Sequence, residues 1–480
     1  MSPARAPRLV RSSALVALVV ALALSPLACG DAGAGDGSDA GSGGASDGVA
    51  ASASSSSQGS SGAASSSSAS ATGSSGGASE SDGEGTDGEG TGATTRATDA
   101  STTAVEPKYD VGVGGDLALD DCGGLVGGPE FSYIWIANSV EGTISKIDTE
   151  TVTELGRYIV RPDSAGDPSR TSVNLAGDVV VANRNGGLTK LYARAADCVE
   201  SNGQPGLQTS DGPAPLPWGE EECVAWHTPM AFSTQRPVAW TAGALNEETC
   251  AYEHAKVWTV GAEVGVPGSA RAIRVNGDTG EIEEVIGFPE LSIGSFGPYG
   301  GAVDGDDNFW FIIGDHEPYP LVRVEADTLA VTVWDVPSPL EPYGITVDPS
   351  GRPWIASTGH GSARFNPQDE TWSVAVGPTG TGIQVDGEGR AWIAYPSAGP
   401  FGVYALDVET MEQVDSVLLP AKVKGISVDF YGYVWAVGLE DSAFRIDPVD
   451  HAVEVVDGLV QPYTYSDMTG WGLSSVQLPG

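Results

Sequence analysis

Residues 343–354 read YGITVDPSGRPW, a short run of β-forming residues, a turn, and a second run that begins at a tryptophan. Two β-forming runs joined by a turn of Asp, Pro, Ser and Gly predict a β-hairpin. The same pattern recurs without a gap at 299–310 (YGGAVDGDDNFW), 381–392 (TGIQVDGEGRAW) and 424–435 (KGISVDFYGYVW). Weaker copies end at Val180 and Trp240. Because two further β runs follow the hairpin, the repeating unit is predicted to have four strands.

Each unit has a marker position in its predicted second strand. The seven markers are Trp135, Val180, Trp240, Trp310, Trp354, Trp392 and Trp435. Seven four-stranded units, mostly of about 40 to 45 residues, predict an all-β fold, a seven-bladed β-propeller. A large ring at the same place in each second strand can fill the space between neighbouring blades. We therefore interpret the tryptophans as packing residues.

The two ends of the repeat region are predicted to share one blade. Trp135 lies in a second-strand pattern, YIWIAN at 133–138, but the Gly-rich residues before it contain no clear first strand. The C-terminal stretch 462–470 (PYTYSDMTG) matches the first strands of the other units. We therefore expect the C-terminal strand to complete blade 1, which closes the ring and leaves no free edge between the first and last blades.

Residues 1–28 are typical of a lipoprotein signal peptide. Three arginines precede an apolar run over 14–24, which is too short to span a bilayer as a helix. Cys29 follows small residues, as the cysteine of a bacterial lipobox does, although Pro26 stands where the lipobox prefers leucine. We expect lipidation at Cys29, with plain secretion as the alternative. The protein would then be held at a bacterial membrane in the cell envelope, facing the periplasm or the exterior.

Residues 29–105 consist almost entirely of Ser, Gly, Ala, Thr and Asp. Such a segment cannot bury enough apolar surface to offset its ordering entropy, so it is predicted to be a disordered linker. A flexible chain of roughly 75 residues spans about 50 Å on average, which suits a tether between a membrane anchor and a folded domain. Residues 106–480 are predicted to form the propeller domain.

The composition excludes some classes of partner. The chain has 64 acidic and 23 basic residues and a net charge of −41, so it would repel phosphate backbones, and we expect no nucleic acid as partner. Four cysteines lie in the exported domain: Cys122, Cys198, Cys223 and Cys250. They suggest two disulfides, with three possible connectivities. We favour Cys198 with Cys223, which bracket an insertion rich in Gly and Pro, and hence Cys122 with Cys250.

In propellers, ligands usually bind on the face formed by the loops between strands two and three and by the loops that join blades. The predicted loops between strands two and three contain Asn138, Glu141, Asn183, Arg184, Asn246, Glu247, Asp315, His316, Glu317, His360, Tyr395, Glu440 and Asp441. The blade-joining loops add Tyr299, Tyr343, Lys424 and Tyr463. A few convergent polar groups around a channel can orient a ligand. Our candidate ligand-binding residues are Asn138, Arg184, Asp315, Glu317, Tyr343, Tyr395 and Lys424.

His316 and His360 are predicted to come from neighbouring blades on this face. A histidine beside a carboxylate such as Glu317 can act as a base or as a metal ligand, but histidines in loops are more often simply solvated. The start of a calcium loop is imitated at 304–308, but the glycine and the distant glutamate of such a loop are missing. We interpret that segment as an ordinary hairpin turn.

The repeat, together with the tract around 146–148, resembles the streptogramin B (virginiamycin B) lyase family of seven-bladed propellers and, more loosely, NHL and SMP-30-like propellers. The resemblance covers about 130–470. It implies an enzyme that opens a cyclic depsipeptide by magnesium-assisted elimination, with a histidine just before the first-strand glycine and a glutamate three residues after the aromatic marker. The matching pairs here are Tyr343 and Ser357, Thr381 and Tyr395, Lys424 and Gly438, and Tyr299 and Ile313.

Because neither family residue is present in any blade, we favour a ligand-binding or protein-interaction module over an enzyme. We expect a monomer that needs no cofactor and binds an unknown small molecule or an envelope protein. The alternative is a streptogramin B lyase-like carbon-oxygen lyase that uses His316 and His360, with Glu317 as a ligand of Mg²⁺. A third possibility is a purely structural envelope protein, whose channel would be filled by side chains.

Overall fold

The computed structural model describes residues 10–11, 132–246, 251–395 and 399–477. The chain divides into two compact units, one formed by 23–103 and the other by the remaining residues, and every described residue belongs to the second unit. The predicted signal peptide, apart from Val10 and Arg11, lies outside the described residues. So do Cys29, the linker, and the predicted pair Cys122 and Cys250.

Seven four-stranded blades form a ring, which confirms the predicted propeller. Blade 1 contains β2 (Tyr133–Asn138), β3 (Thr143–Asp148) and β4 (Thr153–Ile159). Blades 2 to 4 contain β5 (Pro168–Val173), β6 (Val179–Asn183), β7 (Leu188–Leu191) and β8 (Val224–Thr228); β9 (Thr234–Trp240), β12 (Lys256–Ala262), β13 (Arg271–Asn276) and β14 (Ile282–Gly287); and β15 (Pro298–Val303), β16 (Phe309–Ile313), β17 (Pro320–Val324) and β18 (Val331–Asp335). Blades 5 to 7 contain β19 (Pro342–Val347), β20 (Pro353–Ser357), β21 (Ser362–Asn366) and β22 (Thr371–Ala375); β23 (Ile383–Val385), β24 (Arg390–Tyr395), β25 (Phe401–Asp407) and β26 (Gln413–Leu419); and β27 (Val423–Val428), β28 (Val434–Gly438), β29 (Ser442–Ile446) and β30 (Val453–Asp457).

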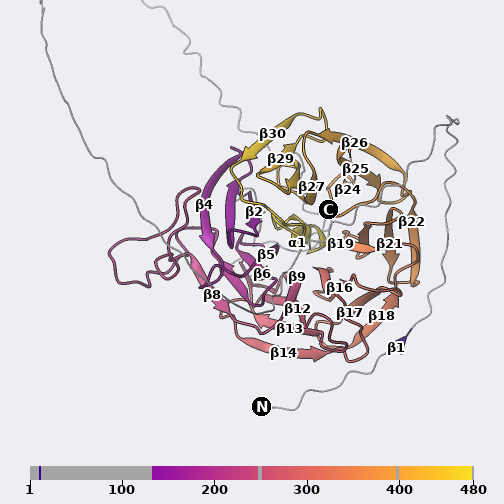
Figure 1. Ribbon diagram of the computed structural model, residues 1–480, viewed down its shortest axis with the longest axis horizontal. Helices are drawn as coiled ribbons and strands as arrows, with labels where there is room; N and C mark the ends of the chain where they lie inside the picture. The colour runs from indigo at the N-terminus through magenta and orange to yellow at the C-terminus, as the bar shows by residue number, and fades with distance from the viewer. Residues whose placement is uncertain (1–9, 12–131, 247–250, 396–398, 478–480) are drawn as a thin grey trace, which may run out of the picture. The chain divides into compact units, whose positions relative to one another are not determined.

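The first strand of each blade faces the central channel and the last strand lies on the outside, as for β14, β22 and β30 in Figure 1. Each blade is antiparallel, and in blades 2 and 4 to 7 strands that follow one another in the sequence are neighbours in the sheet. A two-residue strand, β1 (Val10–Arg11), pairs in parallel with the outer strand β18.

The C-terminal segment 462–468 occupies the innermost position of blade 1, beside β2, which confirms the predicted closure. Tyr463 donates its backbone N–H to the carbonyl of Ala137 at 3.0 Å, and Trp135 donates its own to the carbonyl of Met468 at 2.9 Å. Asn138 and Pro462 form an antiparallel bridge. Trp135, Ala137 and Asn138 of β2 are thereby paired on their channel side, and among the described residues these contacts close the ring without a covalent bond.

The repeated aspartate of the hairpin turn has a structural purpose that explains its fixed distance from the tryptophan. Asp348 accepts hydrogen bonds from the backbone N–H groups of Ser350 and Arg352, both at 3.0 Å, and from the indole Nε1 of Trp354 at 2.9 Å. The same indole-to-carboxylate bond joins Trp310 to Asp304, Trp392 to Asp386, and Trp435 to Asp429. The calcium-like stretch at 304–308 is therefore a hairpin turn of this kind.

The marker tryptophans pack between blades, as expected. Trp354 shares a core with Ile383 and Tyr404 of blade 6. Trp435 of blade 7 shares one with Ile134 and Ile136 of blade 1, so the packing continues across the closure.

The marker predicted for blade 3 is wrong. Trp240 ends β9, the first strand of that blade, and Trp258 in β12 occupies the second-strand position. A small hairpin, β10 (Ala244–Asn246) and β11 (Ala251–Glu253), is inserted between these two strands and delays the second strand. Asn246 therefore lies in the insertion and not in a loop between strands two and three, while Glu247 lies outside the described residues.

A short helix was not predicted. After the closing segment the chain forms α1 (Trp471–Gln477), which lies at the centre of the ring in Figure 1. Trp471 donates its indole N–H to the carbonyl of Val385 at 2.9 Å, and Gln477 donates its amide to Asp307 at 3.2 Å. The helix therefore covers the end of the channel at which the hairpin turns lie. Within the described residues, no helix has the length and apolarity needed to cross a membrane.

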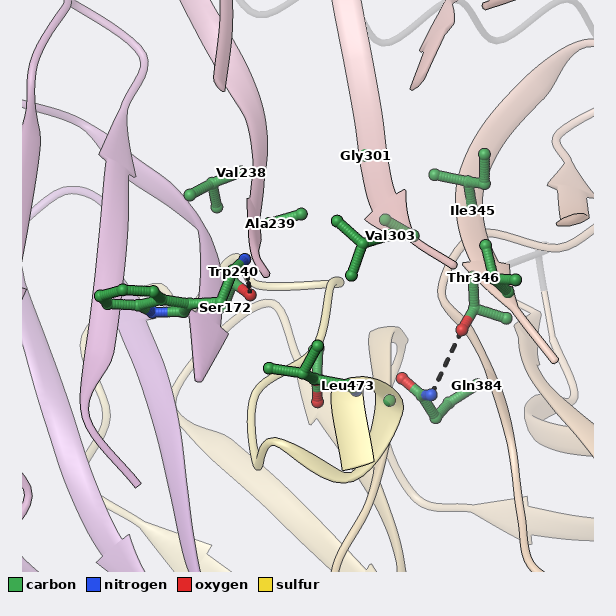
Figure 2. A pocket seen from close by; sticks show the side chains of 14 residues that line it. Ser172, Val238, Ala239, Trp240, Gly301, Val303, Ile345, Thr346, Gln384 and Leu473 are labelled. Atoms are coloured by element: carbon green, nitrogen blue, oxygen red, sulfur yellow. Dashed lines mark hydrogen bonds between the residues drawn. The ribbon is translucent and has the colours of Figure 1, made fainter. Parts of the chain in front are cut away.

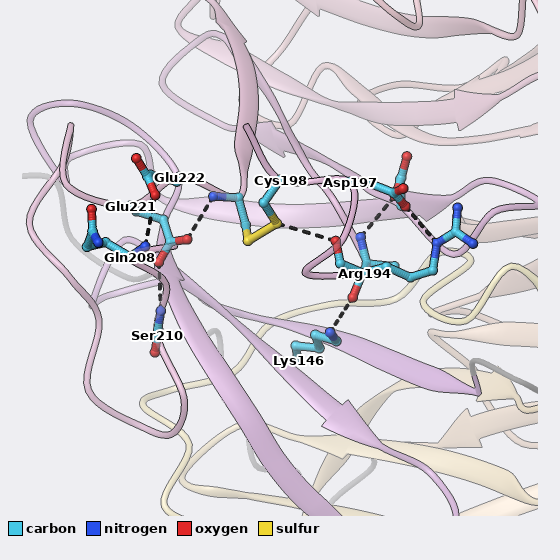
Figure 3. Close-up of a disulfide and its surroundings, with 11 residues drawn as sticks. Lys146, Arg194, Asp197, Cys198, Gln208, Ser210, Glu221 and Glu222 are labelled. Carbon is cyan, nitrogen blue, oxygen red and sulfur yellow. Dashed lines mark hydrogen bonds and ion pairs between the residues drawn. A yellow bond between two sulfur atoms is a disulfide. The ribbon is translucent and has the colours of Figure 1, made fainter. Parts of the chain in front are cut away.

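The predicted disulfide between Cys198 and Cys223 is confirmed (Figure 3). It closes the insertion between β7 and β8, a segment that lacks regular strands. Two buried carboxylates organise the same segment: Glu222 accepts the backbone N–H groups of Ser201 and Gln208, and Glu221 accepts those of Ser210 and Cys223. The insertion is therefore held by both a covalent bond and backbone hydrogen bonds.

Replacing both cysteines of this disulfide by serine is expected to lower the free energy of unfolding by about 2–4 kcal/mol, because the bridge restricts a 25-residue separation in the unfolded chain. Guanidinium denaturation under non-reducing conditions measures the loss. Addition of dithiothreitol should bring the parent protein to the level of the double variant and leave the variant unchanged. Equal stability of parent and variant would show that the glutamate contacts alone hold the insertion.

Candidate functional site at the channel mouth

The two ends of the channel differ in character. At the end covered by α1, a cavity lies between the helix and the inner strands of several blades (Figure 2). It is partly open to solvent, and its lining includes Val238, Val303, Ile345 and Leu473. The Gln384 amide donates to Thr346 at 3.2 Å across its polar side. None of the predicted site residues lines this cavity.

At the opposite end, four cationic and four tyrosine side chains converge. We refer to them as the channel-mouth cluster: Arg170, Arg184, Arg236, Lys424, Tyr299, Tyr343, Tyr463 and Tyr465. They come from the starts of inner strands, from the loop after β6 and from the closing segment, so that six of the seven blades contribute. The cluster is therefore formed only when the ring is complete.

A local irregularity explains why inner strands direct these side chains toward the channel. The pairing of β15, β19 and β27 with the next strand shifts register at Tyr299, Tyr343 and Lys424, respectively. Such a bulge redirects a side chain out of the regular alternation. The glycine that follows permits close approach of the next inner strand, since a Cβ on Gly344 would lie 2.1 Å from the carbonyl oxygen of Thr381.

Tyr463 is the centre of the hydrogen-bond network. Its hydroxyl lies 3.3 Å from Lys424 Nζ and 3.3 Å from the Tyr299 hydroxyl, and it also contacts the Tyr343 hydroxyl. Lys424 Nζ donates to the Tyr343 hydroxyl at 2.8 Å. The Arg184 guanidinium lies 4.3 Å from the centre of the Tyr463 ring, a cation–π distance.

The arginines of the cluster have few anionic partners. Arg170 is fully buried and donates to the backbone carbonyls of Tyr299 and Tyr465. Arg184 pairs with Asp167 at 3.0 Å, but its Nε and Nη2 have no hydrogen-bond partner. Arg236 donates Nη1 to the carbonyl of Phe296 while its Nε has none. Within the described residues, Asp167 is the one carboxylate that forms an ion pair with the cluster.

The charges perturb two titrating groups in the network. Burial, together with the neighbouring cations Lys422, Arg184 and Arg170, lowers the pKa of Lys424 to about 8. Burial by itself raises the pKa of Tyr463. Hydrogen bonds from Tyr299 and Tyr343 and the charge of Arg184 outweigh burial, so the pKa of Tyr463 lies below its usual value.

Titration of the protein monitored by tyrosinate absorbance is expected to show one phase below the ordinary tyrosine pKa of about 10, because the cluster stabilises the phenolate of Tyr463. The phase should disappear in Tyr463→Phe. Tyr404→Phe is the matched control, since burial raises the pKa of Tyr404 to about 12 and its loss should leave the early phase intact. An early phase that persists in Tyr463→Phe would contradict the assignment.

Of the seven predicted ligand-binding residues, the structure brings Arg184, Tyr343 and Lys424 together. Asn138 is fully buried at the ring closure. Its side-chain NH₂ donates hydrogen bonds to the hydroxyls of Thr143 and Ser145, and its side-chain oxygen accepts one from the backbone N–H of Val460. Tyr395 lies at the end of β24, outside the cluster.

The predicted polar residues of blades 4 and 5 are not members of the cluster. Asp315 accepts the backbone N–H groups of Gly294, Phe296 and Gly297, so it holds the loop between β14 and β15. His316, Glu317 and His360 are exposed. In the part of the chain that the structure describes, no three His, Cys, Asp or Glu side chains gather closely enough to hold a metal ion.

Arg170, Arg236 and Tyr465 were missed by the sequence reasoning. Arg170 and Arg236 lie in β5 and β9, the inner strands of the two blades whose repeat pattern is weakest, so no alignment placed them. Tyr465 lies in the predicted closing strand, but its direction toward the channel depends on the pairing with β2.

Comparisons with known proteins concern the architecture. No family model matches the chain, and no curated protein matches it. Among solved structures, a functionally unknown protein from Desulfotomaculum acetoxidans is similar with a TM-score of 0.47 and 13% identity, over 70% of this chain and 98% of its own. A streptogramin B lyase is similar with a TM-score of 0.45 and 16% identity, over 64% of this chain and 88% of its own.

The virginiamycin B lyase from Staphylococcus aureus is similar with a TM-score of 0.41 and 12% identity, over 62% of this chain and 89% of its own. The resemblance to streptogramin B lyases that the repeat predicted is thus found among solved structures as well. At these identities the likeness concerns the fold alone, and the chain is a seven-bladed β-propeller of four-stranded blades.

Proposed function

We propose that this protein is a lipid-anchored, extracytoplasmic propeller that binds a ligand at the channel-mouth cluster. The observation that carries the proposal is the convergence of Arg170, Arg184, Arg236 and Lys424 on four tyrosines at one end of the channel. The ligand is a small molecule or an exposed group of an envelope protein, and no cofactor is needed.

The energetics support binding over a purely structural role. Buried cations and unpaired donors each reduce the stability of a fold, by about 1–3 kcal/mol for an unpaired donor. Apolar side chains fill the spaces between blades without this cost, as the core around Trp392 and Val403 does. A scaffold that only had to close its channel would not need charged groups at the mouth.

A ligand search by thermal shift on the purified domain tests the proposal. A compound counts as a ligand of the site when it raises the melting temperature of the parent and of Lys422→Met but not of Lys424→Met. Lys422 is exposed and two residues from Lys424, so its variant removes the same charge outside the cluster. Ligands that stabilise all three proteins equally would place the binding elsewhere and overturn the proposal.

The anchor is tested separately. Labelled fatty acid should be incorporated into the full-length protein in bacteria, and this label should be lost in Cys29→Ser. If the parent protein carried no label and were released into the medium, plain secretion would be supported instead.

Sedimentation of the purified domain tests the expected monomer.

The lyase alternative predicts a different outcome. Incubation with a streptogramin B depsipeptide and Mg²⁺ would give a ring-opened isomer of unchanged mass, sensitive to a chelator and lost in His316→Ala or His360→Ala. Our proposal expects no turnover. Turnover that depends on either histidine would make the protein an enzyme.

A further inference from the structure

We propose that the channel-mouth cluster is an anion site, which takes the carboxylate or phosphate group of a compact ligand that also presents an apolar body. This inference rests on the proposed function and names the class of ligand. It depends on the balance of charge in the cluster, on its unpaired donors, and on the aromatic surface around them.

The charge balance is the first argument. The cluster contains four cations, and one carboxylate, Asp167, is paired with them. Asp167 itself is 37% exposed, so solvent weakens its compensation of Arg184. Ionisation of Tyr463 offsets one further charge at most. A positive excess held in a partly buried site favours an anion, because attraction between charges is stronger where water is excluded.

The available donors are the second argument. Nε and Nη2 of Arg184 and Nε of Arg236 have no acceptor. Two N–H groups of Lys424 donate to Tyr343 and Tyr463, which leaves its third N–H. Charge-assisted bonds from guanidinium and ammonium groups to carboxylate or phosphate oxygens are among the strongest hydrogen bonds in proteins. All three guanidinium atoms are shielded from solvent, so an anion reaches them only when the partly buried side chains around them, such as Tyr463, move aside.

The surroundings limit what the anion can be. Tyr343 and Tyr463 are partly exposed, and Phe296, 51% exposed, packs edge-on against the buried ring of Tyr299. These rings favour an apolar or aromatic body beside the anionic group. The net charge of −41 repels extended polyanions. The ligand is therefore compact, with its charge concentrated in one group.

Matched probes test this class. Benzoate, benzyl alcohol and benzylamine share one ring and differ in charge, and inorganic phosphate supplies the anion alone. Calorimetric and NMR titrations of the parent protein are expected to show saturable binding of benzoate, at least about tenfold tighter than that of benzyl alcohol, and no binding of benzylamine. Measurable binding of phosphate would identify phosphate as an acceptable anionic group, and its absence would narrow the class to carboxylates.

Variants locate the site. Arg184→Met and Lys424→Met are each expected to weaken benzoate binding at least about tenfold, whereas Lys422→Met should change it less than about twofold. Lys424→Arg keeps the charge and should retain most of the affinity, which separates loss of the site from loss of the fold. Melting temperatures of all variants verify that they are folded. If Arg184→Met or Lys424→Met does not fold, Arg236→Met is used in its place in the same binding test.

Each contrary result has its own meaning. Equal binding of benzoate and benzyl alcohol, lost together in Lys424→Met, would uphold a ligand site at the mouth and overturn the anionic class. Benzoate binding unaffected by both Arg184→Met and Lys424→Met would overturn the location. Absence of saturable benzoate and phosphate binding would overturn the inference, while the thermal-shift search would still decide the proposed function.

Discussion

A chain that ends at Gly458 is expected to lose cooperative unfolding. The missing residues supply the inner strand position of blade 1 and the helix α1, and they bury Tyr465, Met468, Trp471 and Leu473, each 5% exposed or less. At about 1.5–3 kcal/mol for each large apolar side chain, these contacts contribute about 6–12 kcal/mol, which is comparable to the whole stability of a domain. Near-UV circular dichroism and guanidinium denaturation measure the loss.

The graded control lies within the same tail. Trp471→Ala removes one buried ring but keeps the closing hydrogen bonds between 462–468 and β2, so the protein should still unfold cooperatively with a loss of about 3–5 kcal/mol. If the truncated chain denatured cooperatively at a midpoint close to that of the parent, the closure would not be needed for the fold.

Trp435→Phe is expected to destabilise the protein by about 1–3 kcal/mol at pH 7.5 and by much less at pH 5. The indole of Trp435 donates to the fully buried carboxylate of Asp429 at 2.8 Å, and phenylalanine keeps most of the packing but has no donor. Burial raises the pKa of Asp429 to about 6, despite this bond and those from the backbone of Tyr431 and Tyr433. Below that pH the Asp429 carboxyl is neutral, so the indole N–H of Trp435 stabilises it less than it stabilises the buried carboxylate.

The sign follows from proton binding. Between the unfolded pKa of about 3.9 and the folded value of about 6, the folded protein binds more protons at Asp429 than the unfolded chain does, so this group reduces stability as pH rises. Loss of the indole donor raises the folded pKa further and extends that decrease to higher pH. The difference between variant and parent therefore grows as pH increases through about 6.

Trp372→Phe is the matched control for this prediction. Trp372 is as deeply buried, 1% exposed, but its indole nitrogen has no hydrogen-bond partner. Its replacement should cost packing energy that is the same at both pH values. Denaturation midpoints of the two variants at pH 5 and 7.5 make the comparison. Identical pH dependence in both would mean that the indole-to-carboxylate bond contributes nothing measurable.

Much of the fold could be predicted because the hairpin is a local structure. A turn around Asp348 and the β runs beside it are determined by neighbouring residues, and repetition of the pattern carries the prediction to other blades. The prediction failed at Trp240, where insertion of β10 and β11 separates two strands that pair in space. It also missed α1, a seven-residue helix too short to show a clear period in sequence.

The candidate site was predictable only in part. Tyr343 and Lys424 precede the repeated glycine, so the repeat placed them on one face, and Arg184 follows a recognisable second strand. Asn138 and Asp315 occupy equivalent loops, yet their side chains bond backbone groups of the closure and of the loop before β15. Loop sequences did not distinguish these two uses, because the partners are distant in the chain.

The sequence alone determined the number of blades and the place of the closure, since both follow from local pattern, and it favoured the disulfide between Cys198 and Cys223 that the structure contains. Only the tertiary structure decided that Arg170, Arg236 and Tyr465 join Lys424 in one cluster and that α1 covers the other end of the channel. The physical reason is that strand patterns depend on neighbouring residues, whereas convergence at the channel depends on bulges, register and closure of the whole ring.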